Sequence, residues 1–176
     1  MSNIFIKSYK SSLGDILIGI YENQLCILDW QYRKQRDAID MRVTKLLATS
    51  YIIEHHQLHD IVIEQLEEYF TKKRKHFNIP LLFTGTDFQK EVWNELLNIP
   101  YGQTISYLTL SRKLQKEKAI RAVASANGAN AISILVPCHR VIATDGKLTG
   151  YAGGLTTKKK LLQLEGALNR GQLDLF

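Results

Sequence analysis

The chain has 176 residues, of which 45% are hydrophobic, and this suits a globular protein of one domain or two small ones. No apolar run approaches the ~20 residues that span a bilayer, and the first residues lack the layout of a secretory signal. We therefore expect a cytoplasmic protein without membrane attachment. Two cysteines, Cys26 and Cys138, are too few for a disulfide framework, and neither belongs to a CxxC pair that would indicate zinc.

The charge balance is basic, with a formal net charge of +6 at pH 7. Basic chains favour polyanionic partners, although many of them bind no nucleic acid. The basic run 72–75 is expected to be the solvated end of a helix, where cations suit the helix dipole, and a nucleic-acid patch is the alternative. His55, His56 and His59 are expected on a solvated helical face. Charge alone leaves the partner open.

The first half predicts a small antiparallel sheet followed by helices. Short strands are expected over three apolar or alternating runs, residues 3–9, 14–20 and 24–30. Cys26 lies in the third run and is expected to be a small buried hydrophobe. Helical patterns cover residues 36–50 and 59–73, and residues 77–83 are expected to form an extended linker.

The second half predicts a helical module that begins near residue 85. Thr86 and Gln89 have the spacing of a capping box, in which each side chain bonds a backbone N–H group of the other residue. Ser106 is expected to cap the next short helix, and residues 117–127 are expected to form the helix after it. Two short helices joined by a tight turn indicate a helix-turn-helix arrangement.

The second helix of this pair has an unusual composition. Its small residues are Ala119, Ala122, Ala124, Ser125, Ala126, Gly128 and Ala129. Small side chains permit close packing against a neighbouring helix, or close approach of the backbone to a DNA groove, and composition leaves both open. Arg121 is a long cation near the start of this helix. It is placed to reach a phosphate or to enter a duplex from which a base has been displaced.

The segment 137–140, with the sequence Pro-Cys-His-Arg, follows an apolar run over 132–136 that predicts a buried strand. The thiolate is the nucleophilic form of cysteine, and it needs a neighbouring base or cation. Adjacent side chains of an extended segment point to opposite faces, so Cys138 and His139 would need a bridging water or a turn. Glu165 in the last predicted helix is the best candidate to complete a Cys-His-acid relay. Taken alone, Cys138 has the plainer explanation of an inert buried thiol, and His139 has that of a polar loop residue.

Residues 136–142 resemble the active-site signature of the O6-alkylguanine-DNA alkyltransferases, the methylated-DNA–protein-cysteine methyltransferases. Matches to that family cover about residues 80–168, whereas the first 80 residues match only in layout. The further matching segments are Gly85-Thr86-Asp87-Phe88-Gln89, Ile99-Pro100-Tyr101-Gly102, Arg121-Ala122-Val123, Asn127-Gly128-Ala129-Asn130 and Gly150-Tyr151-Ala152-Gly153-Gly154.

The resemblance implies an α+β fold in two domains. Residues 1–84 would form a ribonuclease-H-like N-terminal domain, a small antiparallel sheet with helices. Residues 85–170 would form a helical, winged-helix-like domain that contains the helix-turn-helix and accepts the alkyl group. Residues 171–176 would be a C-terminal tail.

The resemblance also implies roles for the site residues. Cys138 would accept the alkyl group, with His139 as base through a water and Glu165 orienting the imidazole. Asn130 would brace the turn before the active-site strand. Tyr107 would help to rotate the target nucleotide and would donate toward guanine N3.

The same resemblance implies the contacts to DNA and to the extruded base. Arg121 would fill the gap that the flipped base leaves. The expected DNA-contacting residues are Arg121, Ala122, Ser125, Ala126, Asn127, Gly128 and Tyr107. The expected substrate pocket consists of Asn127, Val141, Tyr151, Ala152 and Gly153, in which the Ala152 backbone would donate toward the alkylated oxygen.

The implied function is DNA repair by direct, irreversible, single-turnover transfer of an alkyl group from O6-alkylguanine to Cys138, with O4-alkylthymine as a further candidate substrate. The expected partner is double-stranded DNA bound through its minor groove, the protein is expected to be monomeric, and no cofactor or metal is expected. A non-catalytic lesion-binding module is disfavoured because Cys138 is present. A transcription regulator of this family would need an additional N-terminal module. A thiol hydrolase is a further alternative, which catalytic turnover of an ester or a peptide would support.

Overall fold

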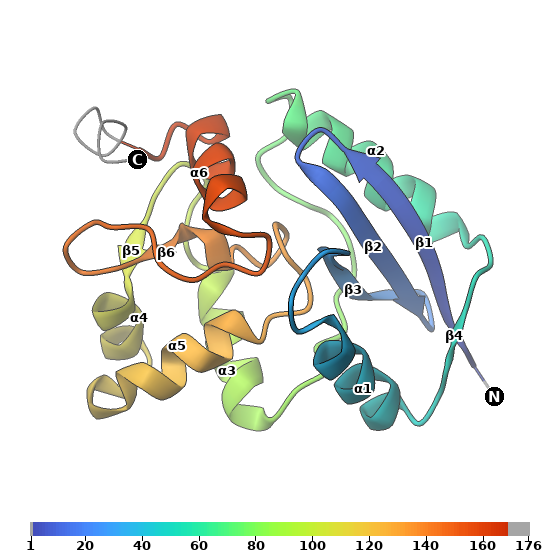
Figure 1. Cartoon of the computed structure of the whole chain (residues 1–176), viewed down its shortest axis with the longest axis horizontal. Coiled ribbons are helices and arrows are strands. Elements are labelled where there is room, and N and C mark those ends of the chain that lie inside the picture. Colours follow the sequence, from blue (N-terminus) through green and yellow to red (C-terminus); the bar gives the residue numbers. More distant parts are fainter. Residues whose placement is uncertain (1, 169–176) are drawn as a thin grey trace.

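The computed structural model describes residues 2–168, so the predicted tail over 171–176 lies outside the described residues. The N-terminal half contains β1 (Ile4–Ser11), β2 (Gly14–Tyr21), β3 (Gln24–Trp30), α1 (Arg36–Leu47), β4 (Tyr51–Ile52) and α2 (Gln57–Phe70). The C-terminal half contains α3 (Asp87–Leu96), β5 (Ile105–Ser106), α4 (Tyr107–Lys113), η1 (Glu117–Ala119), α5 (Ile120–Gly128), η2 (Cys138–Arg140), β6 (Val141–Ile142) and α6 (Leu155–Leu164). The predicted α+β class is confirmed (Figure 1). No helix among residues 2–168 is long and apolar enough to cross a membrane.

The N-terminal sheet has the strand order β3-β2-β1-β4, and α2 lies along it (Figure 1). The three predicted strands are confirmed, and β1 and β2 form an antiparallel hairpin in which Ser11 faces Gly14. Gly14 has φ +134, which favours glycine at this turn. The short strand β4 pairs in parallel with β1 and was not predicted, because two residues are too few to show alternation.

The start of α2 corrects the prediction for the histidines. His56 caps the helix by accepting a hydrogen bond from the N–H of Leu58, and the His59 ring accepts one from the N–H of His56. His59 is fully buried and its Nε2 contacts the carbonyl oxygen of Phe5 in β1 at 3.0 Å. The predicted solvated face is therefore wrong for His59, because the helix turns this residue onto the sheet, whereas His55 is exposed.

One hydrophobic core crosses the predicted domain boundary. Buried Trp30 and Tyr69 of the N-terminal half belong to the same cluster as Trp93 and Val136 of the C-terminal half. The linker between the halves is extended as predicted, and it pairs with the edge of β3 through Leu25, whose N–H donates to Pro80 at 2.8 Å. The two halves are therefore packed as one body around a common interior.

Two arginines of the N-terminal half hold the end of α5. Arg33 donates hydrogen bonds to the carbonyl oxygens of Gly128 and Asn130. Arg42 donates one to the carbonyl oxygen of Ala129, which lies between them in the chain, at 2.8 Å. The buried carboxylate of Asp29 accepts from Arg33 at 2.8 Å. Cations suit the C-terminal end of a helix, so these contacts anchor α5 and the turn after it to the sheet.

The strand predicted over 132–136 is wrong. Ile132 makes an isolated parallel bridge with Leu28 of β3, and the chain then turns, with Ile134 at φ 71. The run is apolar because it passes through the interior, and hydrophobicity alone does not separate a buried turn from a buried strand. Cys138 consequently opens the short 3-10 helix η2 instead of ending a strand.

A buried lysine holds the loop between β6 and α6. The ammonium group of Lys158 donates to the carbonyl oxygens of Val141 at 2.6 Å, Thr149 at 2.8 Å and Gly150 at 3.3 Å. The residue is 0% exposed. Burial disfavours its charge and lowers the pKa of Lys158 to about 8. The loop that follows β6 is thus fixed by a side chain of α6.

Replacing this lysine in Lys158→Met should change how stability depends on pH. In the folded protein the amine loses its proton at about pH 8, whereas its ordinary pKa is 10.5. Between these two pH values Lys158 is more protonated in the unfolded chain than in the folded protein. Lys158 therefore makes the free energy of unfolding rise with pH, by about 3 kcal/mol over the whole range.

Urea denaturation of both proteins across this pH range measures the effect. The difference in unfolding free energy, wild type minus Lys158→Met, should increase with pH, because contributions from other titrating groups cancel. A difference that stays constant contradicts a buried ammonium group at this position.

Candidate active site

Cys138 lies at the first position of η2, and its side chain is 4% exposed. The amide of Asn130 donates to its Sγ at 3.3 Å and to the carbonyl oxygen of Val136 at 2.9 Å. The side-chain oxygen of Asn130 accepts from the N–H of Ile132 at 2.9 Å. A single buried side chain therefore braces the turn after α5 and contacts the thiol at the same time.

The thiol of Cys138 is protonated at rest. Burial raises the pKa of Cys138, and the hydrogen bond from Asn130 and the positive charge of Lys158 offset this only in part. The sequence suggested an activated thiolate, and the structure shows a thiol that a base must first deprotonate.

His139 is the predicted base. Its Nε2 contacts Glu165 Oε1 at 2.8 Å, and both side chains are fully buried. Its Nδ1 makes no hydrogen bond with any protein atom of the described residues. Burial lowers the pKa of His139 even though Glu165 raises it, so the ring is neutral. With its proton on Nε2, the ring presents the Nδ1 lone pair as an acceptor.

Glu165 collects hydrogen bonds from several parts of the chain. The phenol of Tyr69 in α2 donates to it at 2.6 Å, Arg140 Nε donates at 2.9 Å, and the N–H of Gly102 donates at 3.3 Å. Burial alone would raise the pKa of Glu165, but His139 and Arg140 together hold it well below its ordinary value. The carboxylate is therefore ionised and oriented.

Sequence reasoning missed Tyr69. It lies in the half of the chain without motifs, and its spacing within α2 is that of an ordinary core residue. Its role follows from a contact with a residue 96 positions away.

Helix α5 has one exposed face and one buried face. Arg121, Ala122, Ser125 and Gly128 are exposed, so the structure places these predicted DNA contacts on one surface. Ala126 and Asn127 depart from the prediction, because both side chains are 3% exposed. Ala126 faces the core, where its carbonyl accepts from Trp93 Nε1 at 2.8 Å. The small residues of α5 thus allow close packing on its buried face and keep its exposed face low around Arg121.

A cleft of about 520 Å³ lies between residues 32–35, helix α5 and the segment over residues 150–155, and Cys138 and His139 are not among its lining residues. Its walls include five predicted site residues, Tyr107, Gly128, Tyr151, Ala152 and Gly153. Burial and then the nearby Cys138 raise the pKa of both tyrosines, which shows that they lie close to the thiol. Asn127 and Val141 are buried and do not line the cleft, although Asn127 Nδ2 reaches the carbonyl oxygen of Cys138 at 3.5 Å.

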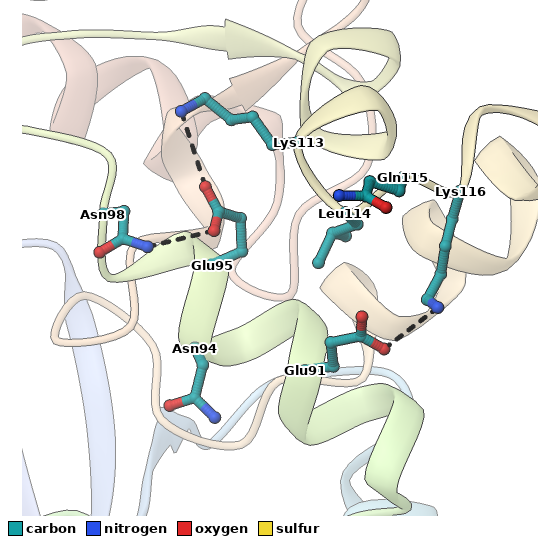
Figure 2. A pocket seen from close by; sticks show the side chains of 8 residues that line it. All are labelled: Glu91, Asn94, Glu95, Asn98, Lys113, Leu114, Gln115 and Lys116. Atoms are coloured by element: carbon teal, nitrogen blue, oxygen red, sulfur yellow. Dashed lines mark hydrogen bonds and ion pairs between the residues drawn. The ribbon is translucent and has the colours of Figure 1, made fainter.

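A second hollow, of about 640 Å³, lies between α3 and the end of α4 (Figure 2). Its charged groups pair with one another, Lys113 with Glu95 at 3.6 Å and Lys116 with Glu91 at 3.3 Å. None of the predicted site residues, all of which are described, lines this hollow. Its charges are already paired and it holds no nucleophile, so we do not take it as the site.

The predicted absence of a metal stays a prediction. Among residues 2–168 there is no group of three or more His, Cys, Asp or Glu side chains that could hold a metal ion.

Two family models match the chain in succession. Residues 4–83 match the ribonuclease-like domain of 6-O-methylguanine DNA methyltransferase, and residues 87–167 match its DNA binding domain. The methylated-DNA–protein-cysteine methyltransferase of Methanosarcina barkeri is 43% identical over 156 residues, which are 89% of this chain and 93% of the relative. An inducible enzyme of the same name from Bacillus subtilis is 50% identical over 101 residues, 57% of this chain and 56% of the relative.

Solved structures agree with these matches. The crystal structure of the Mycobacterium tuberculosis O6-methylguanine methyltransferase has a TM-score of 0.78 and 34% identity, and covers 98% of this chain and 99% of that one. The Mycobacterium tuberculosis protein OGT in complex with DNA has a TM-score of 0.79 and 35% identity over the same shares. The two models together span residues 4–167 with a short gap, and the Methanosarcina barkeri relative is matched over nearly its whole length, so the chain belongs to the 6-O-methylguanine DNA methyltransferase family.

Proposed function

We propose that the protein repairs DNA by transferring the alkyl group of an O6-alkylguanine to the Sγ atom of its own Cys138. The observation that carries this proposal is the buried thiol that directly precedes the His139–Glu165 pair and lies close to Tyr107 and Tyr151, which line a cleft wide enough for a base. The names of the similar proteins describe the same transfer from methylated DNA to a protein cysteine. Double-stranded DNA with the lesion is the proposed partner, and one monomer acts on one lesion.

The reaction is a displacement at the alkyl carbon. His139 takes the thiol proton at Nδ1 through a water, and the thiolate of Cys138 attacks the carbon that is bonded to guanine O6. The carbon–sulfur bond forms as the carbon–oxygen bond breaks, and the electron pair stays on the guanine. Donors near the departing oxygen and the ring stabilise this charge, and we assign them to the Ala152 N–H and the Tyr107 hydroxyl.

The product explains why the protein would act once. A thioether has no hydrolytic route back to a thiol, so each chain would accept one alkyl group. The same displacement would apply to O4-alkylthymine, in which the alkyl group is also bonded to an exocyclic oxygen.

The target base has to leave the duplex before this reaction can occur. The O6 substituent lies within the base stack, and extrusion costs a few kcal/mol. The exposed face of α5 would lie in the minor groove, where small residues allow close approach. Arg121 would occupy the place of the extruded base, since its side chain is exposed on this face.

Label transfer tests the acceptor. Duplex DNA with a radiolabelled methyl group on guanine O6 should pass one label to each wild-type chain. Cys138→Ser should lower this transfer by more than about a hundredfold, because serine is a far weaker nucleophile than a thiolate. Cys26→Ala is the matched control and should react as wild type, since burial raises the pKa of Cys26 to about 12. Undiminished transfer in Cys138→Ser would refute the mechanism.

Arg121→Ala tests the extrusion step. The substitution should slow repair of duplex DNA by roughly tenfold or more, because the vacated position in the stack is no longer filled. The reaction with free O6-benzylguanine, which needs no extrusion, should stay within about twofold of wild type. Rates of Cys138 alkylation, measured by mass spectrometry, give both values.

Arg74→Ala serves as the control for Arg121→Ala. Arg74 belongs to the basic run and pairs with Glu68 at 2.6 Å, so its loss should leave both rates unchanged. Equal losses on both substrates in Arg121→Ala would exclude the proposed role. A loss on duplex DNA in Arg74→Ala would favour the nucleic-acid patch that the basic run left open.

A further inference from the structure

The cleft lined by Tyr107 and Tyr151 has a wall that comes from the N-terminal half. Residues 32–35, which connect β3 to α1, line it together with the loop that carries Tyr151, Ala152 and Gly153. Tyr32 is 50% exposed, although large aromatic side chains are mostly buried. An aromatic ring is therefore held partly open to solvent at the entrance to the proposed substrate site.

The ring of Tyr32 is fixed in position. Its hydroxyl contacts the carbonyl oxygen of Gly153 and the hydroxyl of Thr157, each at 3.2 Å. A Cβ atom on Gly14 would lie 2.7 Å from the ring, so glycine leaves just enough room for it on the side of the β1–β2 turn. Tyr32 is thus a rigid part of the cleft instead of a mobile surface side chain.

A row of aromatic rings leads from the catalytic pair to Tyr32. The ring centroids of His139 and Tyr151 are 6.4 Å apart, those of Tyr151 and Trp30 are 6.4 Å apart, and those of Trp30 and Tyr32 are 5.9 Å apart. Trp30 Nε1 also donates to the Tyr151 hydroxyl at 3.1 Å. The row links the fully buried His139 to the half-exposed Tyr32 in the wall of the cleft.

The size of the cleft allows more than a methylated base. Its volume of about 520 Å³ is in the range of pockets that hold drug-sized ligands. A purine with a methyl group fills only part of such a space. A larger substituent on O6 would extend from Cys138 toward the wall that holds Tyr32, where an aromatic face offers apolar contact.

We propose that Tyr32 is a specificity-determining residue, whose ring contacts the substituent on guanine O6 and favours aralkyl groups such as benzyl over methyl. This inference rests on the proposed function and adds a residue that discriminates among the alkyl groups. The contact comes from the half of the chain that carries no catalytic motif, so the N-terminal half would select the alkyl group that the C-terminal half removes.

The test compares two free bases, O6-methylguanine and O6-benzylguanine, so that DNA binding does not enter. The rate constant for alkylation of Cys138 is measured by intact-mass spectrometry for each base, and the ratio of benzyl to methyl rates is the readout. Because both rates come from the same preparation, the ratio is independent of the fraction of folded protein. Tyr32→Ala should lower this ratio roughly five- to tenfold, since the aromatic contact is lost.

Two further variants separate the ring from its hydrogen bonds. Tyr32→Phe keeps the ring and loses both hydroxyl contacts, and its ratio should stay within about twofold of wild type. Lys34→Ala removes another exposed side chain of the same wall that offers no aromatic face, and its ratio should be unchanged.

The outcomes distinguish the inference from the proposed function. An unchanged or increased ratio in Tyr32→Ala overturns the contact, and so does an equal decrease in Tyr32→Phe, which would place the effect in the Gly153 loop. If wild-type Cys138 takes up no alkyl group from either base or from alkylated duplex DNA, the proposed function itself fails. If wild type reacts and only the Tyr32 ratios disagree, the specificity role alone is wrong.

Discussion

The buried carboxylate of Glu165 is the group on which the rest of the site depends. It accepts hydrogen bonds from Tyr69 in α2, from His139 and Arg140 in η2 and from the backbone of Gly102. A buried charge is costly unless it is paired and its lone pairs are used, and here both conditions are met. These donors come from segments far apart in the chain, and the carboxylate stays ionised after burial because folding brings them together around it. The orientation of His139 is a consequence of that assembly.

The N-terminal half takes part in the site although it carries no motif. Arg33 and Arg42 hold the carbonyls at the end of α5, and that end leads directly to Asn130 and the thiol. The core shared by both halves makes these contacts rigid. A change in the sheet or in α1 therefore acts on the position of Cys138 without touching it. The family models divide the chain between residues 83 and 87, but packing does not divide there.

The two cysteines show that burial by itself does not make a nucleophile. Burial raises the pKa of both thiols. The thiol of Cys26 donates a hydrogen bond to the carbonyl oxygen of Gly19 within the sheet. The sulfur of Cys138 instead accepts a hydrogen bond from Asn130, and the positive charge of Lys158 lowers its pKa. Cys138 also directly precedes His139. Reactivity thus depends on which groups surround the sulfur. A thiol that stays protonated until a base removes its proton is also less reactive toward oxidants and other electrophiles.

The sequence by itself determined the features that depend on neighbours within a few residues. The capping box of Thr86 and Gln89 and the three strands were predictable because hydrogen bonding and side-chain alternation over short distances leave a local pattern. The motif around Cys138 indicated the residue set of the site. Only the tertiary structure decided that residues 132–136 turn instead of forming a strand, that His59 is buried, and that Tyr69 and Tyr32 reach the site. These outcomes depend on contacts between residues far apart in the chain, which leave no periodic signal in either partner.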